Sequence, residues 1–271
     1  MIDGNLILRH KQWDMEISTQ SRAASDTWVV CLHGLQSRKE LFQPLFQRLL
    51  PSDFSLLSLD FVGFGHSSKP EDFSYALEDQ AVIVRQVLER LNVQSLFLIG
   101  HSMGGMVSTM LLKDLEKQLR GFVNMEGNFV LEDCGASLPA SQATYEHFAA
   151  IEYPKLQQEL VTSDELSAAV RREALALTPA YAFYHTSRSI VEWSRSQKLI
   201  PLFMESRVKK VFVYGERNHR KASVLPNTAA KVEIPNAGHF MWSDNPEETL
   251  RTTEDFLLTV PSGRNVATNG K

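Results

Sequence analysis

A serine flanked by glycines is the first feature of the sequence that could carry out chemistry. The segment Gly100-His101-Ser102-Met103-Gly104 follows the apolar run Ser95–Ile99 and precedes a helical pattern. On such a sharp strand-to-helix turn, a serine hydroxyl is exposed in a strained backbone conformation. The two glycines fit this turn because larger side chains would collide with it. The pattern therefore predicts that Ser102 is a nucleophile, with the start of the next helix stabilising negative charge nearby.

A second motif offers backbone donors for the same reaction. Leu32-His33-Gly34-Leu35 ends another apolar run, and a strand that ends in this way brings a backbone N–H close to the nucleophile. We expect the N–H groups of Leu35 and of Met103, the residue after the nucleophile, to form an oxyanion hole. His33 is interpreted as a structural hydrogen-bonding residue of this loop rather than a catalyst.

The general base is predicted from the position of one histidine among eight. His239 follows the apolar run Ala230–Ile234 and lies just before the last helical pattern, which Asn245-Pro246 opens. It is C-terminal to the nucleophile and comes after a late strand. His239 is therefore expected to take the proton of Ser102.

The elements that must position these residues alternate along the chain. Several predicted strands are apolar throughout, which is typical of a parallel sheet covered by helices on both faces. The first two are amphipathic and are expected to form an antiparallel edge. The eight predicted strands are Asn5–Leu8, Asp14–Thr19, Thr27–Leu32, Phe54–Leu59, Ser95–Ile99, Gly121–Met125, Lys210–Tyr214 and Ala230–Ile234. Helices are predicted over Lys39–Leu50, Ser74–Leu91 and Met103–Glu116, and after Asn245.

Residues 129–206 interrupt this alternation with several helix starts and almost no strand signal. A capping-box pattern begins at Thr162, and Thr178-Pro179 marks another helix start. We expect a helical cap here, inserted into a core formed by residues 1–128 and 207–260. Its aromatic residues are expected to fill the insertion's own core for the most part, with a minority lining a pocket. These are Tyr145, Phe148, Tyr153, Tyr181, Phe183, Tyr184 and Trp193.

Composition excludes several other classes of protein. The chain has 271 residues and a net charge of −4, which argues against nucleic-acid binding, since phosphate neutralisation needs a basic surface. Cys31 and Cys134 are too few for a disulfide framework or a metal cluster. No apolar stretch approaches the roughly 18 residues of a membrane span. The first residues lack signal-peptide features, so we expect a cytoplasmic protein, and the polar tail 261–271 is expected to be disordered.

Taken together, these motifs resemble the α/β-hydrolase fold superfamily over about residues 5 to 260. The resemblance rests on His33-Gly34, the loop Asp60–Ser67, the serine motif and Gly238-His239, in this order. It implies an α/β fold with a mostly parallel eight-stranded sheet flanked by helices, and a helical cap after the sixth strand. A nucleotide site in the loop Asp60–Ser67 is rejected, because the third glycine and the helix of such a site are missing.

One position departs from the pattern of this superfamily. The acid usually follows the seventh strand, but Asn218 stands there, and it cannot carry the charge that stabilises an imidazolium. Three interpretations remain open: a displaced acid at Glu126, substitution by Glu216, or a triad without an acid. We favour Glu126, because certain haloalkane dehalogenases place a glutamate after the sixth strand. Asn218 itself is then expected to be nearly dispensable.

The resemblance implies a serine esterase with a catalytic triad of Ser102, Glu126 and His239. Carboxylic-ester or thioester hydrolysis through an acyl-enzyme is the leading interpretation, with a small-molecule substrate and no metal or organic cofactor. Carbon–carbon bond hydrolysis and lactone opening use the same residues. A ligand-binding receptor with weak catalysis is the alternative from another class, and Asn218 is the observation that favours it. The oligomeric state, the pathway and the natural substrate stay open.

Overall fold

The computed structural model describes residues 2–49 and 54–260. The predicted disordered tail and the helix end predicted at Leu50 lie outside these ranges. The described strands form one sheet in the order β1-β2-β4-β3-β5-β6-β7-β8. Their bounds are β1 (Ile2–His10), β2 (Trp13–Arg22), β3 (Thr27–Leu32), β4 (Ser55–Leu59), β5 (Ser95–His101), β6 (Leu119–Met125), β7 (Lys209–Gly215) and β8 (Lys231–Ile234).

Pairing within the sheet confirms the predicted mixture of directions. β1 and β2 form an antiparallel hairpin, and β2 pairs antiparallel with β4. All pairs from β4 through β3, β5, β6 and β7 to β8 are parallel. The carboxyl ends of these parallel strands therefore meet at one edge, which is where ligands bind in open α/β sheets.

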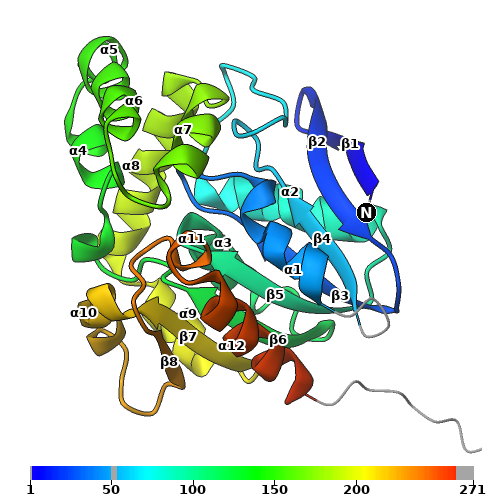
Figure 1. Ribbon diagram of the computed structural model, residues 1–271. Helices are drawn as coiled ribbons and strands as arrows, with labels where there is room; N and C mark the ends of the chain where they lie inside the picture. The colour runs from blue at the N-terminus through cyan, green and yellow to red at the C-terminus, as the bar shows by residue number, and fades with distance from the viewer. Residues whose placement is uncertain (1, 50–53, 261–271) are drawn as a thin grey trace, which may run out of the picture.

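Helices cover both faces of this sheet (Figure 1). One face carries α1 (Gln43–Arg48), α11 (Met241–Asp244) and α12 (Pro246–Leu258), and their apolar side chains share a core cluster with β3 to β7. The other face carries α2 (Leu77–Arg90), α3 (Met103–Leu111) and α9 (Leu199–Glu205), in a second cluster. The sheet is thus the middle layer of three, as its apolar strands predicted.

Three predicted helices differ from the observed ones. The helix predicted over Met103–Glu116 ends early, at Leu111. Residues Lys39–Phe42 form a short 3₁₀ helix, η1, and α1 begins anew at Gln43. Pro44 explains the break, because proline lacks an N–H and suits the first turn of a helix. The helix predicted over Ser74–Leu91 begins three residues later, at Leu77.

Only helices and loops are described between β6 and β7. They are η2 (Leu131–Asp133), α4 (Ser137–Gln142), α5 (Tyr145–His147), a π-helical turn η3 (Phe148–Glu152), α6 (Tyr153–Val161), α7 (Ala168–Ala176), α8 (Ala180–Ser196) and α9. The helix start predicted at Thr162 is wrong, since α7 begins at Ala168. Glu165 of the supposed capping box instead accepts a hydrogen bond from Arg171. Pro179 does precede α8, as predicted.

The aromatic residues of this segment pack on one another. Phe148 lies 5.5 Å from Tyr153 and 5.7 Å from Phe183 between ring centroids, and all three are buried. Tyr153 also donates a hydrogen bond to the Thr178 carbonyl. These contacts give the segment its own core, in line with the first part of the prediction about its aromatic residues.

Candidate active site

Ser102 lies between β5 and α3 in the conformation that the glycine pattern predicted. Its φ is +54° and its ψ is −119°, a region that non-glycine residues avoid. The strain is held in place because its N–H donates to the Met125 carbonyl at 2.9 Å. A Cβ at Gly104 would overlap the Leu32 carbonyl, and one at Gly100 would overlap the Gly104 backbone. Both glycines are therefore needed for β5 and α3 to meet this closely.

The predicted oxyanion loop lies beside this serine. A Cβ at Gly34 would stand 3.0 Å from Ser102 Cβ, so the loop passes directly over the nucleophile. Leu35 N–H has no acceptor among the described residues, and Met103 is the first residue of α3, where the helix supplies none. Two neighbouring N–H groups are thus available for an oxyanion.

His33 holds the shape of this loop, as the sequence predicted. Its Nδ1 hydrogen-bonds the Gly34 carbonyl at 2.8 Å, and its Nε2 accepts from the Phe61 N–H at 3.1 Å. The side chain is fully buried, and burial lowers its pKa, so the ring is neutral. Asp60 adds a second anchor by accepting from the Lys39 N–H at 2.7 Å.

Glu126 is the carboxylate that contacts His239. It follows β6 directly with a φ of +52°, and its Oε2 lies 2.7 Å from His239 Nδ1. The carboxylate is fully buried, whereas the imidazole is 31% exposed. This geometry fixes the Nδ1–H tautomer of His239 and leaves its Nε2 free to accept a proton.

The other acid considered from the sequence faces elsewhere. Glu216 is exposed, and its Oε2 accepts from the Asn236 N–H at 2.7 Å. No contact between Glu216 and His239 exists in the described ranges. Of the two candidate acids, only Glu126 is oriented toward the imidazole.

Asn218 has a role that reasoning from the sequence missed. Its Nδ2 donates to both oxygens of Glu126, at 3.0 Å each. The Gly215 N–H donates to Oε1 at 2.9 Å, and Lys221 Nζ lies 3.4 Å from Oε2. Asn218, at the position where the α/β-hydrolase pattern usually has its acid, thus helps to hold the Glu126 carboxylate in place. Because the carboxylate follows β6, a hydrogen-bond donor rather than a second acid suits position 218.

These contacts decide the charge states of the pair. Burial opposes ionisation of Glu126, but the hydrogen bond and charge of His239, together with Lys221, lower its pKa to about 2. Burial also lowers the pKa of His239, with a further contribution from Lys221 and an opposing one from Glu126. Near neutral pH the site therefore holds a carboxylate and a neutral imidazole, which are the states that a general base requires.

His101, the residue before the nucleophile, ties the two loops together. Its Nε2 lies 2.7 Å from the His239 carbonyl, and the ring is fully buried. Burial and the neighbouring His239 lower the pKa of His101 to about 3, so it stays neutral. Its position couples the backbone of the base to the nucleophile turn.

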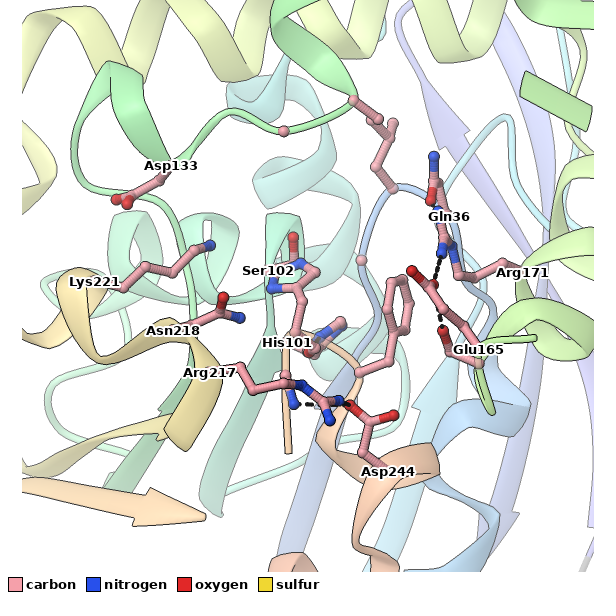
Figure 2. Close-up of a pocket in the computed structure, with 18 of the residues that line it drawn as sticks. Gln36, His101, Ser102, Asp133, Glu165, Arg171, Arg217, Asn218, Lys221 and Asp244 are labelled. Atoms are coloured by element: carbon pink, nitrogen blue, oxygen red, sulfur yellow. Dashed lines mark hydrogen bonds and ion pairs between the residues drawn. The ribbon is translucent and has the colours of Figure 1, made fainter. Parts of the chain in front are cut away.

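Ser102 and His239 open into one cavity of about 840 Å³, which Leu35 and Gly34 also line (Figure 2). Part of its wall comes from the segment between β6 and β7, namely from Asn128, Glu132, Asp133, Gly135, Ala136, Ser137, Asp164, Glu165, Leu166, Ser167, Arg171 and Ile190. None of the seven aromatic residues named in that segment lines this cavity. The expectation that a minority of them would do so is wrong. Five of them pack on one another, and Tyr181 packs on Tyr75; the five are Tyr145, Phe148, Tyr153, Phe183 and Tyr184.

The described residues, 2–49 and 54–260, lack two further features. No three His, Cys, Asp or Glu side chains gather there as a group that could bind a metal ion. No helix in these ranges has both the length and the apolar character that crossing a membrane requires.

Comparisons with known proteins agree with the fold. A sequence model described as the alpha/beta hydrolase fold matches residues 27–143. An uncharacterized hydrolase of Bacillus subtilis is 38% identical over 30% of this chain and 29% of its own length. A putative esterase/lipase of Haemophilus influenzae is 24% identical over 84% of this chain and 82% of its own. The chain thus spans under a third of the first of these relatives.

The solved structures resemble the whole chain more evenly. A carboxylesterase of Nitrososphaera gargenis superposes with a TM-score of 0.78 at 17% identity, covering 94% of this chain and 98% of that one. At this identity the likeness concerns the fold. Together with the matched sequence model and the sheet order, it shows that the chain has the α/β-hydrolase fold.

Proposed function

We propose that the protein is a serine hydrolase that cleaves a small or medium carboxylic ester or thioester through an acyl-enzyme on Ser102. The observation that carries the proposal is the 2.7 Å contact between buried Glu126 and His239, at a cavity that also holds the strained serine. A carboxylate, an imidazole and an exposed hydroxyl are the groups that such triads use. The esterase relatives support the same reaction class.

In the proposed mechanism, Ser102 Oγ attacks the substrate carbonyl while His239 Nε2 takes its proton. Glu126 holds the tautomer and stabilises the imidazolium that forms. The Leu35 and Met103 N–H groups receive the oxyanion. The imidazolium then protonates the leaving group, and a water activated by the same imidazole releases the acid and restores the serine.

The helical segment 129–206 is proposed to act as the cap of this site, over a core of residues 1–128 and 207–260. This segment supplies part of the cavity wall, including Glu132 and Asp133 of η2 and Arg171 of α7. A cap of this kind selects substrates, while the core residues carry out the chemistry.

The receptor interpretation loses the observation that favoured it. Asn218 suggested a triad without an acid, but the 2.7 Å contact of Glu126 with His239 supports an acid at residue 126. Lactone opening and carbon–carbon bond hydrolysis remain outcomes of a substrate panel, because both use a serine and a base in the same geometry.

A fluorophosphonate probe tests the proposal. We expect covalent labelling at Ser102, located by peptide mass spectrometry, and steady turnover of short p-nitrophenyl esters. Ser102→Ala is expected to lose both, while its thermal unfolding stays close to that of the parent. If Ser102 remains unlabelled in the folded protein, and no ester, thioester, lactone or diketone is turned over, the proposed function is wrong.

A further inference from the structure

The wall of the cavity is polar to a degree that does not suit a long acyl chain. Among the described lining residues, the apolar side chains are Leu35, Ala136, Leu166, Ile190 and Phe240. Leu166 is 69% exposed, so it lies at the rim. Most other lining side chains are ionised or form hydrogen bonds. A fatty acyl group would leave many of these polar groups without water or partners, which is costly.

Lys221 is the cation of this wall whose hydrogen-bonding capacity is unused. It belongs to α10 (His219–Ser223), and its side chain is only 13% exposed. Its Nζ forms an ion pair with Glu126 Oε2 at 3.4 Å, yet it donates no hydrogen bond among the described residues. The two oxygens of Glu126 are already occupied by Gly215, Asn218 and His239. Figure 2 shows Lys221 reaching from its helix toward Ser102.

The other cations of the cavity have partners. Arg171 donates to Gln36 at 2.8 Å and to Glu165 at 2.5 Å. Arg217 pairs with Asp244 at 2.6 Å. Arg220 is exposed and donates to a backbone carbonyl. Among these cations, Lys221 is the mostly buried one whose side chain makes no hydrogen bond in the described ranges, so a ligand can still bind its ammonium.

The acids of the cavity do not occupy Lys221 either. Asp133 accepts from the N–H groups of Phe129 and Val130 through its Oδ2. Glu132 and Asp164 are exposed. No ion pair between any of these three carboxylates and Lys221 exists in the described ranges. The buried negative charge beside Lys221 is thus that of Glu126 alone.

A neutral donor stands on the opposite wall. Gln36 is 6% exposed; its Oε1 accepts from Arg171, but its Nε2 has no partner among the described residues. Gln36 directly follows the oxyanion residue Leu35, and Figure 2 places it across Ser102 from Lys221. Buried donors without acceptors are rare in folded proteins, and a ligand is one way to satisfy them.

Resting on the proposed function, we propose that the substrate is a small polar ester or thioester bearing a free carboxylate, which binds the Lys221 ammonium while the ester carbonyl lies at Ser102. Gln36 Nε2 donates to a second oxygen of the same substrate. Lys221 then has two roles: its charge compensates that of the Glu126 carboxylate, and its ammonium binds the carboxylate of the substrate. Neutral esters of equal size bind the same cavity without this contact.

Matched ester pairs test the proposal. The first compares p-nitrophenyl glutarate, which keeps a free carboxylate, with p-nitrophenyl valerate. The second places the charge on the leaving group, as 4-carboxyphenyl butyrate against phenyl butyrate. We expect kcat/KM to favour the anion in at least one pair by about 10-fold or more, the range for a hydrogen bond to a charged group.

Lys221→Met is expected to lower kcat/KM for both members of a pair, because Glu126 loses a neighbouring charge. The preference for the anion should fall by about 10-fold or more as well. Lys113→Met, at an exposed lysine outside the cavity, is the matched control and should keep the preference. Lys221→Arg should restore part of it. An equal loss for charged and neutral esters, or no preference in the parent protein, overturns the proposal.

A binding measurement separates this inference from the proposed function. Ligand-observed NMR follows glutarate with Ser102→Ala and with the double variant Ser102→Ala/Lys221→Met, both checked by circular dichroism. We expect binding to the first and at least about 10-fold weaker binding to the second. Equal binding to both overturns the anion site, whatever Ser102 does. If Ser102 is not labelled by the probe but glutarate binding depends on Lys221, the anion site stands and the hydrolase proposal falls.

Discussion

Replacing Glu126 by glutamine is the most direct test of the displaced acid. The carboxylate faces donors on all sides: Gly215 N–H at 2.9 Å, Asn218 Nδ2 at 3.0 Å, His239 Nδ1 at 2.7 Å and the Lys221 ammonium at 3.4 Å. A glutamine NH₂ group must therefore oppose at least one donor. If it opposes the imidazole, Nδ1 has to accept, and Nε2 keeps the hydrogen that blocks it as a base.

Loss of the correct tautomer and of the charge costs on the order of 10⁴-fold in triads of this type. That factor corresponds to about 5.4 kcal/mol of transition-state stabilisation. We therefore expect kcat/KM of Glu126→Gln, measured with a short p-nitrophenyl ester, to fall by about this factor. The side-chain shape is preserved, so circular dichroism should show an intact fold.

Glu216→Gln is the matched control for this experiment. Glu216 is exposed and contacts the Asn236 backbone, so its loss should change kcat/KM by no more than about threefold. The reasoning is refuted if Glu126→Gln keeps more than about a tenth of the parent activity. It is equally refuted if the two variants lose the same amount.

Three further outcomes follow from the same contacts. Asn218→Asp places a second carboxylate about 3 Å from Glu126; like charges raise the pKa of the pair, so thermal melts should show a deficit in Tm that grows as pH rises from acid to neutral. Lys221→Met removes a charge that, after burial, lowers the pKa of the base histidine, so the acid limb of the pH profile of kcat/KM should move to higher pH. Gly104→Ala should lower the free energy of unfolding by about 3 kcal/mol or more in urea, because its Cβ would overlap backbone, whereas Gly135→Ala meets nothing within 4 Å and should leave it unchanged. The first expectation is wrong if the Tm deficit of Asn218→Asp does not change with pH. The second is wrong if the acid limb of Lys221→Met does not move, and the third if the two alanine variants have equal urea midpoints.

The strands were predictable because a strand that is buried on both faces consists largely of apolar residues, and such runs are visible in the sequence. Thr27–Leu32 agrees residue for residue with β3, and the remaining seven differ only at their ends. Those ends depend on hydrogen bonds to neighbouring strands, such as the pairing of Ile2 with Ser21, which a one-dimensional pattern does not contain. The helices shifted for the same kind of local reason, as Pro44 shows.

The site was predictable where its chemistry is local in sequence. The turn around Ser102 and the loop before His239 carry their own glycine patterns. The part played by Asn218 was hidden, because its partner Glu126 is 92 residues away and the two meet only through adjacent strand ends. Lys221 was missed because a five-residue helix has no motif of its own. Spatial neighbours of this kind follow from sheet order rather than from spacing.

The aromatic residues between β6 and β7 show the opposite error. A minority of them was expected to line a pocket, yet none lines the cavity, and Phe148, Tyr153 and Phe183 are buried against one another. A helical segment that must stay folded over a sheet needs an apolar centre, and this requirement comes before any ligand. Charged and amide side chains line the cavity instead.

The pairing of β6 with β7 has a practical consequence for engineering. Met125 lies opposite Val213 in the sheet, so the chain leaves for the helical segment and returns from it along two neighbouring strands. A foreign segment joined at these two points would face the same serine and imidazole. Chimeras that exchange residues 129–206 between proteins of this fold are therefore a rational library for new substrate ranges, provided that Asn218 and Lys221 are kept from the recipient protein.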